Sequence, residues 1–266
     1  MPRAAPAIGQ IGDTSPMPTE SLQNMVINVL VAGARASELA VRGPARLGTP
    51  LPKPPRNADP VVLIPGFANG ASMLDVMKRS LEADGFRAFV FDDPNHGLGD
   101  YRLAADRFDA FVRDVQAQTG AKKIDMVAYS AGATVGRTWL ARDADAVKRT
   151  DSFVDLDGSW RGDDDHRFLN IIKQVPGVGN DLWNALPPAE LQLQPGSDLF
   201  GELAQHPELP RGVRVTSIVG GGTVGARDYV PGATNIELPD SPNHLAMVRT
   251  SNSAYEAVRG ALLSRR

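Results

Sequence analysis

The residues with the clearest chemical signature lie around Ser130, in the segment Ala128-Tyr129-Ser130-Ala131-Gly132. A short apolar run precedes this segment, and small residues that favour a helix follow it. A serine at a sharp strand-to-helix turn is exposed at the carboxyl end of a sheet, and small residues two positions on either side of it avoid collisions. The segment therefore predicts a nucleophile elbow of the Gly-x-Ser-x-Gly type, in which Ala128 replaces the first glycine.

A serine nucleophile needs a general base, because its hydroxyl is a weak nucleophile at its own pKa. The chain offers four histidines: His96, His166, His206 and His244. His244 follows the last predicted strand, which should bring it to the sheet edge that holds Ser130, and we predict that it is the base. His166 and His206 lie in polar segments and are expected to be solvated. His96 lies in a loop near the predicted pocket, and an ordinary loop role is favoured for it.

Alternating strands and helices are predicted to position these side chains. Apolar runs predict strands over residues 61–64, 87–91, 124–128, 152–156, 214–219 and 235–238. Helical patterns are predicted over residues 73–81, 101–119 and 251–263, and from residue 132 onward. This alternation predicts the α/β class, with a mostly parallel sheet that carries helices on both faces.

Composition restricts the class of protein further. The 266 residues are 42% hydrophobic and 22% charged, which is enough apolar material for a sizeable core. The net charge of −3 and the lack of a basic run argue against nucleic-acid binding. The chain has no cysteine, which excludes disulfides, thiolate metal sites and a cysteine nucleophile.

Residues 1–57 are expected to precede the main domain of residues 58–266. They comprise a loose arm over residues 1–18, an amphipathic helix from Thr19 to about Arg42 that packs on the domain, and a proline-rich linker. The apolar run in this helix is too short to span a membrane. Its late position and the preceding Glu20 are atypical of a signal peptide, which slightly favours a cytoplasmic location, although secretion stays open.

Residues 160–210 form a long insert between two predicted strands. Apolar residues at helical spacing predict that the insert covers an apolar cleft in the manner of a lid, or simply adds to the core. The acidic run Asp163-Asp164-Asp165 is most simply explained as the start of a helix. A calcium site there is the less favoured alternative, so no metal is predicted.

Further segments of this framework resemble those of a known family. They are Pro65-Gly66-Phe67, Pro94-Asn95-His96-Gly97-Leu98-Gly99-Asp100, Thr119-Gly120-Ala121-Lys122-Lys123 and Pro195-Gly196-Ser197. Together with the elbow, they resemble small bacterial triacylglycerol lipases and esterases of the α/β-hydrolase fold over about residues 58–265. The resemblance implies that fold, a serine esterase or lipase mechanism, and no cofactor.

An enzyme of this kind needs two backbone N–H groups that stabilise the oxyanion. The residue after the nucleophile supplies one of them, and the loop after the first strand supplies the other. These positions are Ala131 and Phe67 in this chain. Only backbone amides are required, so the side-chain types place no restriction on the assignment.

The acid that orients the histidine is the open position. Matching the family pattern places Thr223 where the related lipases carry an aspartate, and threonine cannot supply the charge. Asp157 directly follows a predicted strand, in a Leu-Asp pair such as pancreatic-type lipases carry at their acid. Asp228 lies later, in an Asp-x-Val-Pro pattern found in other hydrolases. We favour Asp157 because a strand end has a fixed position, and a Ser-His dyad remains a third alternative.

The expected activity is cleavage of small-molecule or lipid-like carboxylic esters through an acyl-enzyme intermediate. A biosynthetic acyltransferase or cyclase of the thioesterase kind would use the same Ser-His site with another acceptor. A non-catalytic binding protein on a hydrolase scaffold is the second alternative, which Thr223 favours and Ser130 and His244 oppose. The sequence leaves the oligomeric state open.

Overall fold

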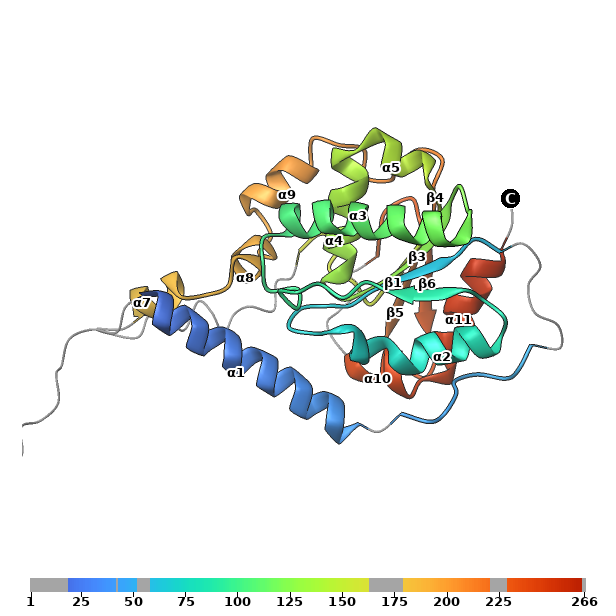
Figure 1. The fold of residues 1–266 in the computed structure, drawn as a ribbon, viewed down its shortest axis with the longest axis horizontal. Coiled ribbons are helices and arrows are strands. Elements are labelled where there is room, and N and C mark those ends of the chain that lie inside the picture. The colour runs from blue at the N-terminus through green and yellow to red at the C-terminus, as the bar shows by residue number, and fades with distance from the viewer. Residues whose placement is uncertain (1–18, 42, 52–57, 163–178, 221–228, 265–266) are drawn as a thin grey trace, which may run out of the picture.

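A parallel β-sheet forms the centre of the molecule (Figure 1). The computed structural model describes residues 19–41, 43–51, 58–162, 179–220 and 229–264. Within these ranges the strands pair in parallel, in the order β2-β1-β3-β4-β5-β6. They are β1 (Val61–Ile64), β2 (Ala88–Val90), β3 (Ile124–Tyr129), β4 (Thr150–Leu156), β5 (Arg214–Gly220) and β6 (Thr234–Leu238). Every predicted strand is present within two residues of its predicted ends, so the α/β class is confirmed.

Helices cover both faces of the sheet, as predicted. One face carries α3 (Tyr101–Thr119), α4 (Gly132–Arg142) and α5 (Ala144–Lys148), and the other carries α2 (Asp75–Ala83), α10 (His244–Arg249) and α11 (Asn252–Leu263) (Figure 1). The remaining described helices are α1 (Thr19–Ala40), the 3-10 turn η1 (Ala71–Leu74), α7 (Gly179–Asn184), α8 (Pro188–Gln192) and α9 (Asp198–Leu203). The pattern predicted over residues 73–81 is thus divided between η1 and α2.

Each face of the sheet has its own apolar core. On the α3 and α4 side, Phe108 packs edge-on against Trp139 with ring centroids 5.1 Å apart, and both side chains are buried. On the other side, Met77 and Tyr255 are fully buried against the sheet. Strands β1 and β3 are buried along their whole length, because both of their faces are covered. The two cores hold the carboxyl ends of the central strands in fixed positions.

The ends of α3 follow directly from the sequence. Asp100 caps the helix, and its side chain accepts a hydrogen bond from the backbone N–H of Arg102 at 2.7 Å. The helix ends at Gly120, which has a φ of 69° in the left-handed region that glycine adopts without strain. Helix α3 therefore covers the predicted residues, Tyr101–Thr119, without a shift.

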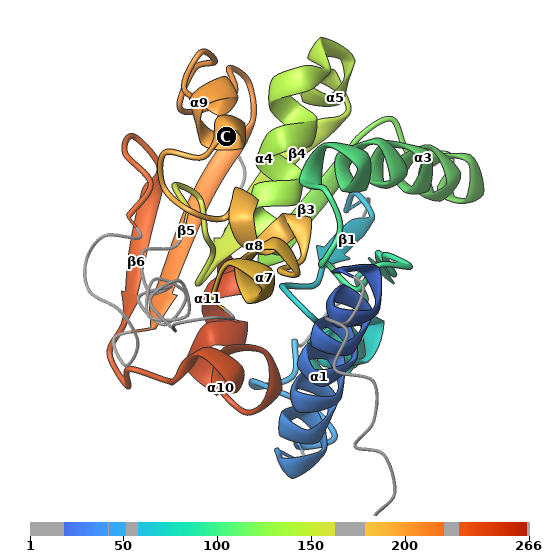
Figure 2. The same ribbon diagram turned by 90° about the vertical axis from the view of Figure 1, so that its left-hand side faces the viewer.

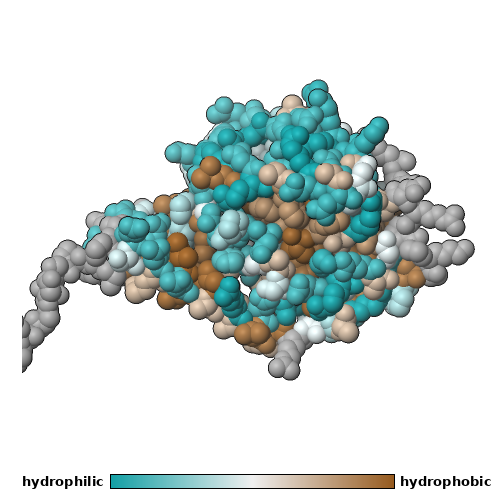
Figure 3. Space-filling model, viewed as in Figure 1, coloured by the Kyte–Doolittle hydropathy of each residue, from teal (hydrophilic) through white to brown (hydrophobic). Residues whose placement is uncertain are grey.

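Helix α1 lies outside the two cores. It contacts α7, and the two helices lie side by side in both ribbon views (Figure 1 and Figure 2). Arg249 of α10 holds the carboxyl end of α1, because the Nε of Arg249 donates to the carbonyl oxygen of Val41 at 2.8 Å. Met25, Val29 and Leu39 of α1 are exposed apolar side chains. Apolar patches are visible on this side of the molecule (Figure 3). None of the described helices is long and apolar enough to cross a membrane.

The described part of the insert is helical and packs next to the loop that follows β2. The backbone N–H of Ala189 in α8 donates to the carbonyl oxygen of Leu98 at 3.3 Å, and Gln192 hydrogen-bonds the side chain of Asp100 at 2.7 Å. Residues 163–178 lie outside the described ranges, and they include Asp163-Asp164-Asp165. The lid-like role of the insert and the domain boundaries therefore stay predictions.

Candidate active site

Ser130 sits at a strained turn between β3 and α4. Its φ is 55°, a left-handed conformation that costs a non-glycine residue energy and that clusters at functional sites. Hydrogen bonds on both sides of the residue hold the turn: its N–H donates to Leu156 at 3.2 Å, and its carbonyl oxygen accepts from Ala133 at 3.0 Å and from Ser159 at 3.2 Å. These contacts fix the serine between β4 and the first turn of α4.

The small residues of the elbow motif are required by close backbone contacts. A Cβ atom on Gly132 would lie 2.5 Å from the carbonyl oxygen of Ile64 and 2.7 Å from that of Pro65, which leaves no room for a side chain. Ala128 is fully buried and pairs with Ile64 of β1 and Asp155 of β4. The packed sheet accommodates its methyl group, so the departure from glycine is compatible with the turn.

His244 and Asp157 are brought together from positions 87 residues apart. Nδ1 of His244 lies 2.6 Å from Oδ2 of Asp157, within hydrogen-bond distance. The prediction placed His244 in a loop, but it is the first residue of the short helix α10, which the side chain of Asn243 caps. The capped helix start fixes the histidine backbone more firmly than a loop would.

Asp157 is held by β5, the strand that pairs with the one it follows. It directly follows β4, has a φ of 49°, and donates its backbone N–H to the carbonyl oxygen of Ile218 in β5 at 2.8 Å. Its Oδ1 accepts a hydrogen bond from the N–H of Gly220 at 3.2 Å, which leaves Oδ2 for His244. The carboxylate is almost fully buried, whereas the imidazole is 40% exposed. The acid is thus rigid, and one side of the base stays open.

Tyr129 provides a contact to His244 that the sequence analysis missed. Its ring stacks on the imidazole with centroids 4.7 Å apart and an interplanar angle of 26°, and its hydroxyl donates to the carbonyl oxygen of His244 at 3.0 Å. Burial, with a smaller contribution from the charge of Asp157, raises the pKa of Tyr129, so the phenol stays protonated. Tyr129 directly precedes Ser130, and this stacking places the imidazole against the elbow.

The structure brings Ser130 and His244 to the same region without joining them directly. Among the described residues, no hydrogen bond links Oγ of Ser130 to the imidazole. Such bonds are often long in an unliganded enzyme and shorten when substrate binds. Asp157 occupies Nδ1, so Nε2 is the imidazole atom available to a hydroxyl on the elbow.

The loop after β1 closely approaches the serine. A Cβ atom on Gly66 would lie 2.7 Å from Cβ and 3.2 Å from Oγ of Ser130, so only glycine fits beside the hydroxyl. Phe67 follows in this loop, and Ala131 begins the turn into α4. Neither backbone N–H donates to another residue in the described ranges. Both amides therefore stay candidates for the oxyanion hole.

The remaining candidates fall into two groups. Asp228, Thr223 and His166 lie outside the described residues. His96 lies beside the loop after β1, where its Nδ1 would be 3.5 Å from a Cβ on Gly70. His206 is exposed and lines a cavity that includes none of Ser130, Asp157 and His244. The described ranges hold no group of three or more potential metal ligands.

Solved structures with a similar fold include several esterases. A mature lipase of Bacillus licheniformis aligns with a TM-score of 0.61 at 16% identity, over 82% of this chain and 97% of that one. A carboxylesterase of Bacillus subtilis aligns with a TM-score of 0.51 at 13% identity, over 92% of this chain and 99% of that one. The NocB thioesterase domain has a TM-score of 0.50 at 14% identity, over 78% and 96% of the two chains. At these identities, the similarity establishes the fold alone.

Sequence comparison gives the family. No curated protein matches the chain. A family model described as alpha/beta hydrolase fold matches residues 59–201, which is more than half of the chain and includes β1 to β4 and the elbow. The protein belongs to the α/β-hydrolase family, as the resemblance implied.

Proposed function

We propose that the protein is a serine hydrolase that cleaves carboxylic esters through an acyl-enzyme intermediate. The main supporting observation is the 2.6 Å contact between Nδ1 of His244 and the buried carboxylate of Asp157, next to a serine in a strained elbow. A carboxylate in this position orients the imidazole and stabilises its protonated form. In this role Asp157 would supply the charge that Thr223 cannot, which argues against a non-catalytic protein.

In the first half of the reaction, Nε2 of His244 accepts the proton of the Ser130 hydroxyl while Oγ attacks the ester carbonyl. The resulting oxyanion receives hydrogen bonds from the N–H groups of Phe67 and Ala131. Such donors are effective because they already point to the place where the charge develops. The imidazolium then protonates the leaving alkoxide, and the acyl group remains on Ser130.

In the second half, water replaces the alcohol. His244 removes a proton from the water, the hydroxide attacks the acyl carbonyl, and the oxyanion forms again at the same two amides. Collapse of this intermediate releases the carboxylic acid and returns the proton to Oγ of Ser130. Asp157 stays ionised throughout and keeps Nδ1 in the required tautomer.

Hydrolysis of p-nitrophenyl esters tests this proposal. We expect the wild-type protein to release p-nitrophenol and free acid, and Ser130→Ala to lose turnover by a factor of at least about 10³. Ser253→Ala is a matched control, because Ser253 is a hydroxyl residue in α11 that the mechanism does not use. Equal turnover by wild type and Ser130→Ala would exclude the mechanism.

The proposal extends to the substrate class, which is esters with acyl chains longer than acetate. The apolar residues of the insert support acyl chains longer than acetate, because most small-molecule sites are lined mainly by apolar side chains. We expect kcat/KM to rise from the acetyl to the octanoyl ester, since each buried methylene contributes about 0.8 kcal/mol. Equal values for the two esters would contradict an apolar acyl cleft but would leave the serine mechanism intact.

A further inference from the structure

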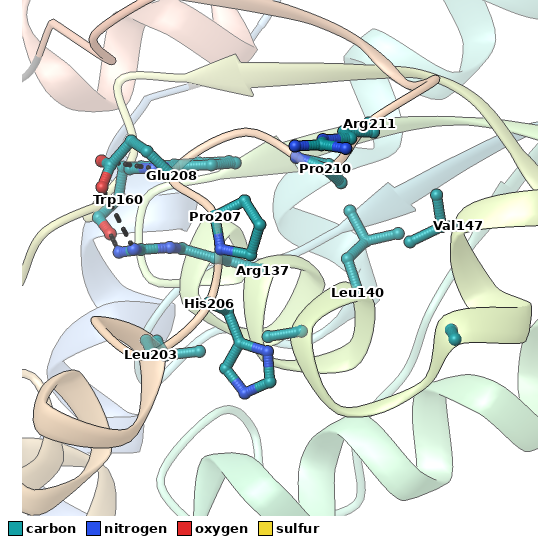
Figure 4. A pocket seen from close by; sticks show the side chains of 12 residues that line it. Arg137, Leu140, Val147, Trp160, Leu203, His206, Pro207, Glu208, Pro210 and Arg211 are labelled. Atoms are coloured by element: carbon teal, nitrogen blue, oxygen red, sulfur yellow. Dashed lines mark hydrogen bonds and ion pairs between the residues drawn. The ribbon is translucent and has the colours of Figure 1, made fainter.

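A cavity lies on the α4, α5 and α9 side of the molecule (Figure 4). Its volume is about 310 Å³, and neither Ser130, Asp157 nor His244 lines it. Helix α4 runs away from the elbow, and Leu140 in the cavity wall lies eight residues beyond its first residue, Gly132, about 12 Å along the helix. The cavity is therefore a site of its own, for which the hydrolase mechanism has no use.

Apolar side chains from three elements form most of its walls. Leu140 comes from α4, Val147 from α5 and Leu203 from α9, while Pro207 lies between them (Figure 4). Trp160 closes another side and is almost fully buried. A surface of this kind favours a ligand with an apolar body, and the volume corresponds to the small end of typical ligand pockets.

The buried charges at one end of the cavity are already paired. Arg137 is only 7% exposed; its guanidinium donates to the carbonyl oxygen of Trp160 at 2.5 Å and lies 3.5 Å from the carboxylate of Glu208. Glu208 also accepts from the indole N–H of Trp160 at 3.2 Å and from Arg161 at 2.9 Å. One carboxylate thus pairs with two guanidinium groups, and Arg137 and Glu208 of this cluster line the cavity.

Two more basic side chains lie at the opening. Arg211 and His206 are exposed and line the cavity, and Figure 4 shows Arg211 next to Pro210. Within the described part of the chain, Arg211 forms no ion pair or hydrogen bond. A cation beside an apolar wall is a favourable partner for an anion, because a charge-assisted hydrogen bond is stronger than a neutral one.

We propose that this cavity binds an amphipathic monocarboxylate, such as a medium-chain fatty acid. The apolar chain would lie against Leu140, Val147 and Pro207, and the carboxylate would pair with Arg211 at the opening. Two arginines and one glutamate are among the lining residues, so the cavity disfavours a cationic ligand. The site is independent of ester hydrolysis, so its test does not depend on the proposed function.

Calorimetric titration with octanoate tests the site. We expect binding with a Kd below about 1 mM. Octanol, which has the chain without the charge, should bind at least about tenfold more weakly, as should octyltrimethylammonium. Equal affinity for octanol and octanoate would contradict recognition of the carboxylate.

Two surface variants test whether octanoate binds in this cavity. Arg211→Gln removes the anchoring charge, and Ala144→Phe fills the cavity from the exposed first turn of α5; each should weaken octanoate binding at least about tenfold. Arg79→Gln is the matched control: Arg79 is an exposed residue of α2, on the opposite face of the sheet, and its substitution should leave the affinity unchanged. All three positions are exposed, and unchanged melting temperatures would show intact folds. No measurable binding of octanoate, or unchanged binding in both cavity variants, would overturn the proposal.

Discussion

At the scale of single residues, the proposed mechanism depends on which atoms hold the imidazole of His244. One side of the ring stacks on Tyr129, and Nδ1 contacts Asp157. Asp157 is in turn fixed by backbone groups of Ile218 and Gly220. Every residue in this set lies in a strand or directly next to one. These contacts therefore restrict the imidazole ring more than contacts from a loop would.

Asp157→Asn should lower turnover by a factor of several hundred or more while the protein stays folded. Asparagine keeps the shape but loses the negative charge that stabilises the imidazolium, and it can favour the wrong tautomer. Asp228→Asn, with the same change in the other candidate acid, should have a much smaller effect. Measurement of kcat on one p-nitrophenyl ester, with melting temperatures for both variants, gives the comparison.

The opposite ranking would assign the acid to Asp228. If neither substitution changed kcat by more than about tenfold, which corresponds to about 1.4 kcal/mol, the enzyme would use a Ser-His dyad. Either result would show that the contact between Asp157 and His244 is structural.

Tyr129 should act as a positioning residue for His244. Tyr129→Phe retains the stacked ring and should lower kcat only a few-fold. Tyr129→Leu removes the stack and should lower kcat at least about tenfold, because even small misplacement of a catalytic group is costly. The pH profile of kcat separates this role from a purely structural one, since a displaced imidazole shifts the profile. Identical kcat and pH profiles for wild type and Tyr129→Leu would contradict it.

The sequence allowed most of the candidate site to be predicted, for identifiable reasons. Ser130 follows from a local pattern, and Asp157 was favoured because it directly follows a strand. Chain order could not distinguish it from Asp228, because both aspartates lie between Ser130 and His244. The stacking of Tyr129 could not be predicted, since its partner lies 115 residues away and the orientation of a ring depends on tertiary packing.

At the scale of elements, the elbow depends on the close approach of α4 to the end of β1. Gly132→Ala should destabilise the protein by about 2 kcal/mol or more, because the new methyl group meets two backbone carbonyl oxygens that cannot move away. Gly260→Ala is the matched control in α11: a Cβ there meets nothing within 4 Å, and the better helix propensity of alanine should stabilise by up to about 1 kcal/mol.

Urea denaturation of the two variants measures both changes. Stability of Gly132→Ala equal to that of the wild type would mean that the elbow is less tightly packed than the structure indicates. Activity should fall with stability in Gly132→Ala, because displacement of α4 also moves Ser130 and the N–H of Ala131. Gly260→Ala should retain full activity.

Local signals explain which elements the sequence predicted well. Helix α3 was predicted without error because Asp100 and Gly120 mark its ends. Helix α10 was missed, because six residues capped by Asn243 give too short a pattern to separate from a loop. Sequence periodicity also did not distinguish the 3-10 turn η1 from α2, since the chain continues from one into the other.

At the scale of the whole molecule, stability is linked to pH through a buried acid at the start of β3. Asp125 is 5% exposed, and its carboxylate contacts the hydroxyl of Ser152. The pKa of Asp125 is raised to about 7, mainly by burial; the hydrogen bond from Ser152 and the charge of Arg214 oppose this rise, and the charges of Asp59 and Asp151 add to it. Folding therefore favours the protonated form of this group.

This shift predicts that stability falls as pH rises from about 4 to 7. Below the unfolded pKa, Asp125 is protonated in both states and contributes no penalty. Above it, the unfolded chain releases the proton first, so the free energy of unfolding decreases by up to about 1.4 kcal/mol per pH unit until the folded pKa is reached. Asp125→Asn should remove this slope, with stability near that of the wild type at pH 4 and higher at pH 8.

Denaturant unfolding of wild type and Asp125→Asn at pH 4, 6 and 8 measures the linkage. Asp84 and Asp109, whose pKa values are lowered to about 2, lose stabilising contacts only below about pH 4, and they do so equally in both proteins. The difference between the two curves therefore isolates Asp125. Parallel curves over this range would show that the carboxylate is not held protonated.

The most direct test of the central claim is covalent labelling of the intact protein with a fluorophosphonate, followed by mass spectrometry of its peptides. The proposed mechanism predicts one adduct, on Ser130, and no labelling of Ser130→Ala. It also predicts slow labelling of Asp157→Asn, because activation of the hydroxyl depends on an oriented His244. An adduct that persists in Ser130→Ala, or a wild-type protein that stays unlabelled while folded, would contradict the assignment of Ser130 as the nucleophile.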